Sequence, residues 1–234
     1  MNCPKAGSSG VLLHPEKAVN RAPENFKVLF TVTTGKSRGR FVIQVHRAWS
    51  PIGADRFYNL VRVGYYKGAP FFRVIPGFVA QVGISGCPSV NGAWKNAYIK
   101  DDVLPAGRRK SNVRGYVSFG TDSDHPGWSR TTHIFINYAD NSGKAKKPGA
   151  PRLDDLGFTP FGYVDARGMA AADKLYGGLG RGFNEPKCGC KSAGECADKE
   201  ECKGPDQDLL EKQGNAYAAQ FPGLDYVLDA RIIE

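Results

Sequence analysis

Short alternating apolar runs, separated by glycine-rich turns, limit the folds open to this chain more than any other feature. Residues 26–46 hold two such runs around the polar turn at 34–39, which is the pattern of a β-hairpin. Further short runs recur at 71–83, 113–120, 132–138, 158–164 and 225–233. Many short strands with few helices favour an antiparallel barrel or sandwich, so we expect a mainly β protein.

Two segments carry the spacing of an amphipathic helix. Residues 50–64 begin with Ser50-Pro51 and end at Gly64, and their apolar stripe consists of Ala54, Phe57, Leu60 and Val61. Residues 170–180 place Ala171, Leu175 and Leu179 on one stripe. We therefore predict one helix in each segment.

The composition fits one domain with additions. The chain has 234 residues, of which 41% are hydrophobic and 24% are charged. Residues 1–25 show no periodicity and are expected to form an extended or mobile N-terminal arm. Residues 26–234 form the folded domain, which includes a Cys-rich insertion at about 184–204 where apolar residues are scarce.

The net charge of +9 predicts a surface that attracts acidic partners, anionic lipid or nucleic acid, and charge alone does not choose among them. No run approaches the roughly 18 apolar residues that span a bilayer, so we expect no membrane span. The first residues have neither the long apolar segment nor the cleavage pattern of a secretory signal. The sequence therefore does not decide the cellular compartment.

The stretch FFRVIPGFVAQVG, residues 71–83, reads as two apolar strands hinged at Pro76-Gly77, each with one long polar side chain, Arg73 or Gln81. It resembles the cyclophilin signature Phe-His-Arg-Val-Ile-Pro-Gly-Phe-Met-x-Gln-Gly-Gly. The resemblance continues in YYKGAPFFRVI, VSFG, SRTTHIFIN and LDDLGFTPFGYV, covers roughly residues 26–179 and resumes in the terminal strand. The stretches GFTPFG, GPDQ, GNAY and FPGLDYV are more similar to a bacterial or protist branch.

This resemblance implies an eight-stranded antiparallel closed barrel capped by two α-helices, and peptidyl-prolyl cis/trans isomerase activity without a cofactor. A twisting X-Pro bond frees the lone pair of the prolyl nitrogen, which can then accept a hydrogen bond. Arg73 is the candidate donor because its guanidinium stays charged at physiological pH. By family position, Gln81 holds the substrate backbone and orients Arg73.

The family places the other substrate contacts around these two side chains. The apolar floor for the pyrrolidine ring is assigned to Phe78, Val79, Phe135, Leu153 and Phe158. The backbone of Gly120 and Thr121 is expected to hydrogen-bond the peptide, and residues 120–122 with Thr131 line a neighbouring pocket. His133 stands where the family has glutamine, and it either contacts substrate or only fills space.

Several positions depart from the signature. Phe72 replaces the histidine before the arginine, and Val82 replaces the first glycine after Gln81. A histidine and a tryptophan at the pocket rim of the short cytosolic type are replaced by Phe158 and by Leu153 or a neighbour. Retention of activity is therefore an open question at these positions.

The insertion contains Cys188, Cys190, Cys196 and Cys202, whose spacing lacks the paired Cys-x-x-Cys of common zinc ribbons. Two local disulfides are slightly favoured, while a zinc site and free thiols remain alternatives. Cys3 and Cys87 have no evident partners in the sequence.

Our first hypothesis is an isomerase that acts on proline-containing polypeptides during folding. The alternative is a cyclophilin-fold binding or structural subunit, docked into a larger assembly through its basic surface, its arm or its insertion. Basic residues at 108–110, with Lys144, Lys146 and Lys147, raise a third hypothesis of RNA or ribosome binding. Charge runs are usually solvated loops, so nucleic acid is the least expected partner.

Overall fold

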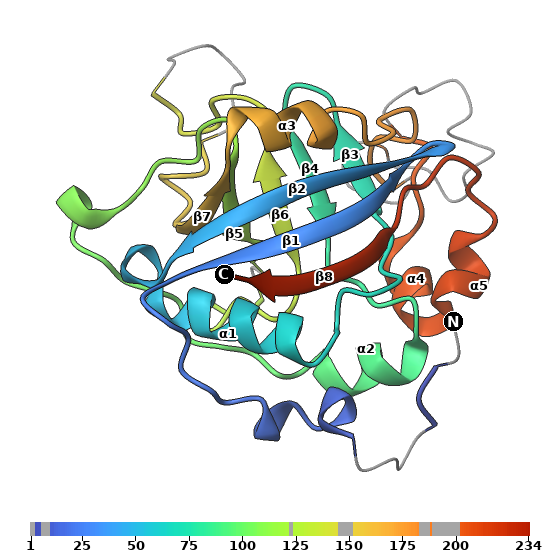
Figure 1. Cartoon of the computed structure of the whole chain (residues 1–234), viewed down its shortest axis with the longest axis horizontal. Coiled ribbons are helices and arrows are strands. Elements are labelled where there is room, and N and C mark those ends of the chain that lie inside the picture. The colour runs from blue at the N-terminus through green and yellow to red at the C-terminus, as the bar shows by residue number, and fades with distance from the viewer. Residues whose placement is uncertain (1–2, 6–9, 122–123, 145–151, 183–187, 189–201) are drawn as a thin grey trace.

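An eight-stranded antiparallel sheet forms the body of the molecule in the computed structural model, which describes all residues except 1–2, 6–9, 122–123, 145–151, 183–187 and 189–201. The strands lie in the order β3-β4-β6-β5-β7-β2-β1-β8 and curl into a barrel (Figure 1). Their bounds are β1 Asn25–Thr34, β2 Ser37–His46, β3 Arg73–Ile75, β4 Val79–Val82, β5 Tyr116–Phe119, β6 Ile134–Asn137, β7 Pro160–Val164 and β8 Val227–Ile233. Each strand overlaps a run predicted from the sequence, and β1 begins one residue before its run.

The helices differ more from the prediction. The described residues contain five α-helices where two were expected: α1 Pro51–Arg62, α2 Pro88–Trp94, α3 Ala166–Ala172, α4 Gln207–Gln213 and α5 Asn215–Ala218. Four 3₁₀ turns accompany them: η1 Val11–Leu13, η2 Pro15–Lys17, η3 Arg47–Trp49 and η4 Ala106–Arg108. Figure 1 shows α1 and α3 at opposite ends of the barrel, whereas α2, α4 and α5 gather beside it.

The second predicted helix has the wrong bounds. The helix α3 begins after Asp165, whose carboxylate accepts a hydrogen bond from the Gly168 amide at 2.8 Å, and it ends at Ala172 instead of running over 170–180. Leu175, which was assigned to its stripe, is buried beyond the helix end. The helix starts at its N-cap residue, Asp165, which precedes the predicted apolar stripe.

The barrel closes between the segments that precede its two edge strands. Pro70 and Tyr226 form an antiparallel bridge, and the Phe71 amide donates to the Asp225 carbonyl at 2.8 Å. The buried Asp225 carboxylate accepts from Thr33 Oγ1 at 2.9 Å and from the amides of Gly35 and Tyr176 at 2.8 Å. One side chain thus joins the β1–β2 turn, the segment after α3 and the closing seam.

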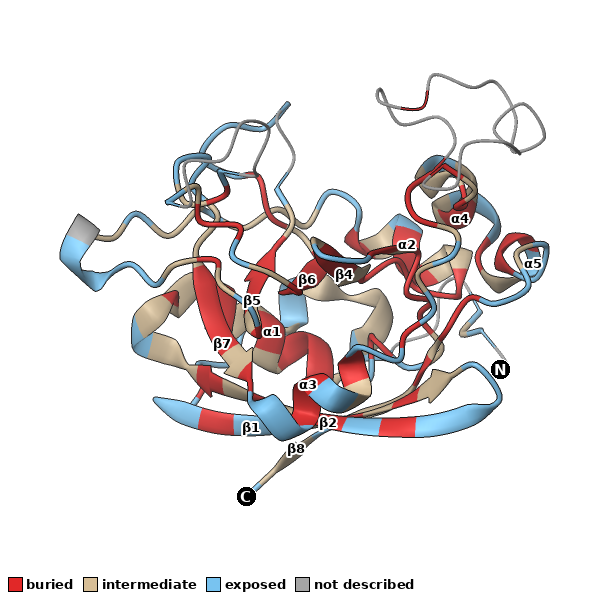
Figure 2. Ribbon diagram, turned by 90° about the horizontal axis from the view of Figure 1, so that it is seen from above, coloured by how far each residue is buried: buried red, intermediate tan, exposed pale blue. Residues whose placement is uncertain are grey.

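Apolar residues of the sheet and of α1 fill the barrel. Along α1, the predicted stripe of Ala54, Phe57, Leu60 and Val61 is buried. Figure 2 shows buried residues on the inner parts of β5, β7 and α1, while the hairpin alternates between buried and exposed residues. A second cluster seats α4 and α5 against the barrel, and it comprises Phe72, Ile84, Leu210, Tyr217, Ala218 and Leu224.

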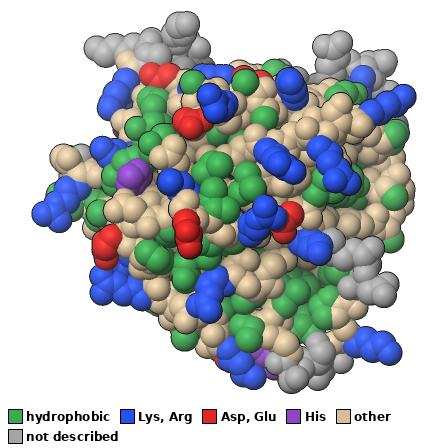
Figure 3. All heavy atoms as spheres, viewed as in Figure 1, with side chains coloured by type: hydrophobic (Ala, Val, Ile, Leu, Met, Phe, Trp, Pro, Cys, Tyr) green, Lys and Arg blue, Asp and Glu red, His purple; other side chains and the backbone are tan. Residues whose placement is uncertain are grey.

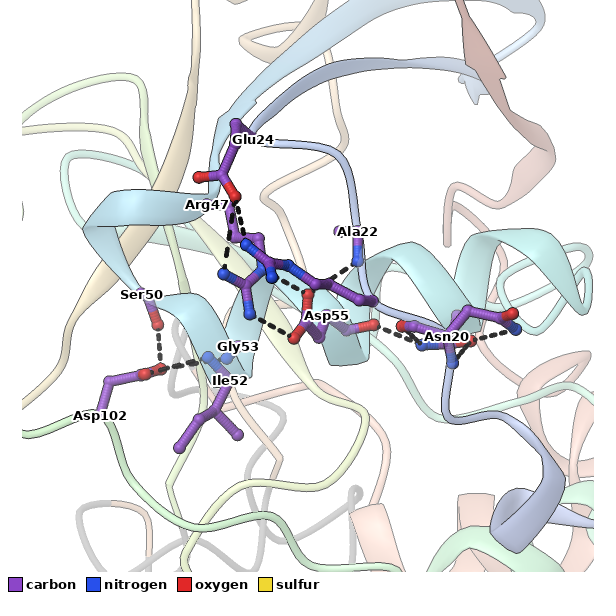
Figure 4. A network of polar contacts seen from close by, with 11 residues as sticks. Asn20, Ala22, Glu24, Arg47, Ser50, Ile52, Gly53, Asp55 and Asp102 are labelled. Carbon is purple, nitrogen blue, oxygen red and sulfur yellow. Dashed lines mark hydrogen bonds and ion pairs between the residues drawn. The ribbon is translucent and has the colours of Figure 1, made fainter.

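The N-terminal end of α1 is held by polar side chains from distant segments (Figure 4). The Asp102 carboxylate accepts from the Ser50 hydroxyl and from the amides of Ile52 and Gly53, both at 3.0 Å. A carboxylate at this position satisfies free amides and complements the positive end of the helix. One turn further on, the Asp55 carboxylate accepts hydrogen bonds from Nε and Nη2 of Arg47, both at 2.8 Å.

Described parts of the arm lie along the domain's own helices. The Ala22 amide donates to Asp55 at 2.8 Å, and the Trp94 indole donates to the Leu12 carbonyl at 2.7 Å (Figure 4 shows the former). A disulfide joins Cys3 to Cys87, across a sequence separation of 84 residues. The described residues of the arm, which include η1 and η2, are therefore bound to α1 and α2.

The disulfides correct one prediction and support another. Cys3 and Cys87, which had no evident partners in the sequence, are bonded to each other. In the insertion Cys188 pairs with Cys202, as the favoured alternative held, while Cys190 and Cys196 lie outside the described residues. The residues that the structure describes contain no cluster of three or more side chains able to hold a metal ion.

The positive charge is dispersed over the visible surface. Figure 3 shows Lys and Arg side chains scattered across the face seen in Figure 1, with acidic side chains between them. That face therefore presents no single basic stripe. No helix in the described ranges is long and apolar enough to cross a membrane.

Replacing Asp225 with Ala is expected to lower the free energy of unfolding by about 2 to 4 kcal/mol, because three donors at the closing seam lose their acceptor. Urea unfolding at pH 7 measures the change. Asp229→Ala on the exposed side of β8 is the control and should stay within about 0.5 kcal/mol of wild type. An Asp225 variant as stable as the control would show that the seam does not depend on this carboxylate.

Replacing Cys3 with Ser is expected to lower the free energy of unfolding by about 2 to 4 kcal/mol without reductant, because a long loop is no longer closed in the unfolded chain. With dithiothreitol the variant and the wild type should unfold alike. A difference that persists in reductant would assign the effect to the serine rather than to the disulfide.

Candidate active site

The antiparallel pairing of β3 with β4 places Arg73 directly opposite Gln81. The Arg73 Nη1 donates to Gln81 Oε1 at 3.3 Å, and the guanidinium carbon lies 5.5 Å from the centre of the Phe78 ring. Both side chains are partly exposed, although their neighbours Val74, Ala80 and Val82 are buried. The strand period therefore sends the polar pair outward and its neighbours into the core.

An apolar cavity of about 170 Å³ opens beside this pair. Val79, Phe135 and Leu153 are buried in it, with exposed fractions of 2%, 4% and 7%. Phe78 and Phe158 pack against them as partly buried walls, and the rings of Phe135 and Phe158 meet edge to face at 5.6 Å. All five predicted floor residues thus surround one hollow, and Arg73 and Gln81 line the same hollow.

Gly120 and Thr121 form another edge of the cavity. The Gly120 amide donates to the His133 carbonyl at 2.9 Å, which continues the pairing of β5 with β6. A Cβ atom on Gly120 would lie 3.3 Å from Gln81 Nε2, so the absence of a side chain lets the glutamine approach this edge. Thr121 is exposed at the rim, and Asp122 of the predicted neighbouring pocket lies outside the described residues.

A network of buried amide side chains, which the sequence did not indicate, supports the cavity from below. Asn112 Nδ2 donates to the Phe158 carbonyl at 2.8 Å, and Asn141 Nδ2 donates to the Phe78 carbonyl at 2.9 Å. Asn137 connects them, because it donates to Asn112 Oδ1 at 3.4 Å and accepts from Asn141 Nδ2 at 2.8 Å. Both phenylalanine walls are therefore held through their backbone carbonyls.

His133 does not line the small cavity. It borders a second, larger hollow of about 660 Å³ that also reaches Arg73, Gln81, Gly120 and Thr121. Its ring lies 5.4 Å from the Phe72 ring, and burial lowers the pKa of His133 to about 4. The imidazole is therefore neutral at physiological pH.

Two departures from the signature, Phe72 just before β3 and Val82 in β4, face away from the cavity. Phe72 has an exposed fraction of 1% and packs with Ile84, Leu210 and Tyr217. Val82 has an exposed fraction of 2% and belongs to the main core. Neither replacement changes the lining of the apolar hollow.

The titration of His133 predicts acid sensitivity. A histidine whose pKa falls from 6.5 to about 4 on folding binds fewer protons folded than unfolded between these pH values, so stability is lost as the pH falls through this window. The loss should reach at most about 3 kcal/mol. His133→Gln should flatten this part of the profile in urea unfolding at pH 7, 5.5 and 4.5, whereas exposed His125→Gln should keep it. Parallel profiles of wild type and His133→Gln would contradict the assignment.

Comparisons with known proteins identify one family. Residues 29–187 match the family model described as cyclophilin type peptidyl-prolyl cis-trans isomerase/CLD. The peptidyl-prolyl cis-trans isomerase A of Dickeya dadantii is 32% identical over 160 residues, which cover 64% of this chain and 76% of the relative. A peptidyl-prolyl cis-trans isomerase-like 3 of Gibberella zeae is 31% identical over 153 residues, which cover 62% and 82%.

Solved structures of cyclophilin-type isomerases share the fold of this chain. A crystal structure of a Cryptosporidium parvum cyclophilin type peptidyl-prolyl cis-trans isomerase superposes with a TM-score of 0.54 at 18% identity, covering 90% of this chain and 98% of that one. A second structure of that protein, in the presence of the dipeptide Ala-Pro, gives 0.53 at 19% identity, covering 89% and 99%. With the family model matched over most of the barrel, this chain belongs to the cyclophilin-type peptidyl-prolyl cis-trans isomerases.

Proposed function

We propose that this chain catalyses the rotation of X-Pro peptide bonds in proline-containing polypeptides, with Arg73 as the catalytic residue. The observation that carries the proposal is that the guanidinium, held by Gln81 at 3.3 Å, lines the same hollow as a wall of apolar side chains. The isomerase names of the relatives and the Ala-Pro dipeptide named with the Cryptosporidium protein support the same activity.

Rotation of an X-Pro bond is accelerated by a hydrogen-bond donor directed at the prolyl nitrogen. Rotation breaks amide resonance, which sets a barrier of about 20 kcal/mol, and the prolyl nitrogen becomes pyramidal on the way. A donor aimed at that nitrogen stabilises the twisted bond more than either planar isomer. One charged hydrogen bond contributes about 1.5 to 3 kcal/mol, which corresponds to about 10- to 100-fold in rate.

The apolar hollow supplies the binding. A pyrrolidine ring that leaves water for the space between Phe78, Phe135 and Phe158 gains about 1.5 to 3 kcal/mol, on the scale of a valine or leucine side chain. A ring seated there brings its nitrogen to the edge that Arg73 and Gln81 share. We assign the peptide backbone to Gln81 and to the strand edge at Gly120 and Thr121, and a flanking side chain to the hollow beside His133.

Replacing Arg73 with Ala is expected to lower kcat/KM by about 10- to 100-fold in an isomerase assay on a short X-Pro peptide, because the transition state loses its charged donor. Arg73→Lys, which keeps the charge but loses the planar fork, should also be slower than wild type. Arg231→Ala on β8, an exposed arginine far along the chain, is the matched control and should retain the full rate.

Equal rates for wild type and Arg73→Ala would reject this mechanism. If neither protein isomerises the peptide faster than the uncatalysed reaction, the alternative, a cyclophilin-fold binding or structural subunit, would take its place. Retention of peptide binding without turnover would then be the expected behaviour of both proteins.

A further inference from the structure

The larger hollow continues directly from the proposed proline site. Its lining includes Arg73, Gln81, Gly120 and Thr121, which also border the apolar cavity. A peptide whose proline occupies the smaller cavity must therefore pass residues on one side of that proline over the larger one. Whatever charges line the larger hollow will act on those residues.

One wall of this hollow comes from α4. Gln207, Asp208 and Glu211 of α4 line it, opposite Thr131 and His133 of the barrel and beside Asn91 and Lys95 from α2 and its end. The helix α4 lies beyond residues 29–187, which match the family model. This wall therefore lies outside the stretch of the chain that the family model matches.

The α4 wall is acidic and short of counter-charge. Glu211 has a side chain 37% exposed, and its Oε1 lies 3.9 Å from His133 Nε2, which carries no charge at neutral pH. Within the described part of the chain, Glu211 forms no ion pair with a lysine or arginine. Asp208 is its i−3 neighbour on the helix surface and adds a second carboxylate. The cations of the same lining are Lys95, at the end of α2, and Arg73, where the hollow meets the proline site.

The titration of Glu211 supports this reading of the charges. Burial and the neighbouring Asp208 raise its pKa above the ordinary value, while Lys95 and Lys212 lower it less. A carboxylate with a raised pKa is one whose negative charge is incompletely compensated by its surroundings. A ligand cation placed in the hollow would supply the missing charge.

We propose that α4 makes the larger hollow select substrates with a lysine or arginine flanking the proline, and that Glu211 is the specificity-determining residue. This inference rests on the proposed function for its substrate class. Glu211 takes no part in rotating the bond, so its contribution belongs to binding. Asp208 reinforces the same preference from the exposed rim.

Peptides that differ only at the positions flanking one X-Pro bond test this. Lys, Ala and Glu are placed in turn at each of two positions on either side, and kcat/KM and Kd are measured for each peptide. At the position that reaches the hollow, we expect the Lys peptide to exceed the Glu peptide by about 5- to 10-fold, with Ala between them. The preference should shrink in 1 M salt, because the hollow is partly open to solvent.

Glu211→Gln keeps the side-chain size and should reduce the preference to about 2-fold or less. It is expected to fold, because the carboxylate is itself unfavourable at this place. Glu16→Gln in the arm makes the same chemical change away from the hollow and should keep the wild-type preference.

The two proposals fail separately. If no peptide is turned over but the Lys peptide binds more tightly in a Glu211-dependent way, the proposed catalysis is wrong and the selection by α4 stands. If turnover is efficient but Lys and Glu peptides are equal at every position, or if Glu211→Gln leaves the preference intact, the inference about α4 is overturned.

Discussion

The antiparallel register of β3, β4 and β6 is the constraint on which the site depends. Arg73 stands opposite Gln81, and Gln81 stands opposite Phe135 on the next strand. The same pairings send Val74 and Ala80 into the main core. Because side chains alternate between faces, a slip of one residue would bury the guanidinium and expose Val74. The burial of the core residues therefore maintains the spacing of the polar pair, and the site needs no separate device to position it.

The apolar cavity has walls of two kinds. Val79 and Phe135 belong to strands, whereas Leu153 and Phe158 come from an irregular segment that has no ladder to hold it. Asn112 holds this segment in place. Its Nδ2 donates to the Phe158 carbonyl, and its backbone amide donates to the Asp154 carboxylate, both at 2.8 Å. Because a buried polar network is stable only when its members are satisfied, this wall has one well-defined position. Ring binding and bond rotation are thus supported by different parts of the chain.

The sequence predicted the sheet better than its surroundings. Strands with period-two patterns and the long stripe of α1 were found correctly, because burial on one face leaves a local signal. The short helices α2, α4 and α5 were missed, since α2 has only Val90 and Trp94 as large buried apolar residues and includes Gly92. The predicted cavity residues do surround one hollow, although their roles remain predictions. The amide network, the Cys3–Cys87 pair and the approach of Glu211 to His133 are contacts between distant segments, for which no local pattern exists.

The departure from the family signature at Phe72 is connected with the packing of α4 and α5. A histidine at this position would place a polar ring where Phe72 now packs against Leu210 of α4 and Tyr217 of α5. Asn91 of α2 also binds α4, because its Nδ2 donates to the Glu211 carbonyl at 3.1 Å. These two contacts fix the distance of α4 from β3 and β6, and hence the place of the Glu211 carboxylate beside His133. A residue that faces away from the apolar cavity therefore shapes the neighbouring hollow, through the helix that it holds.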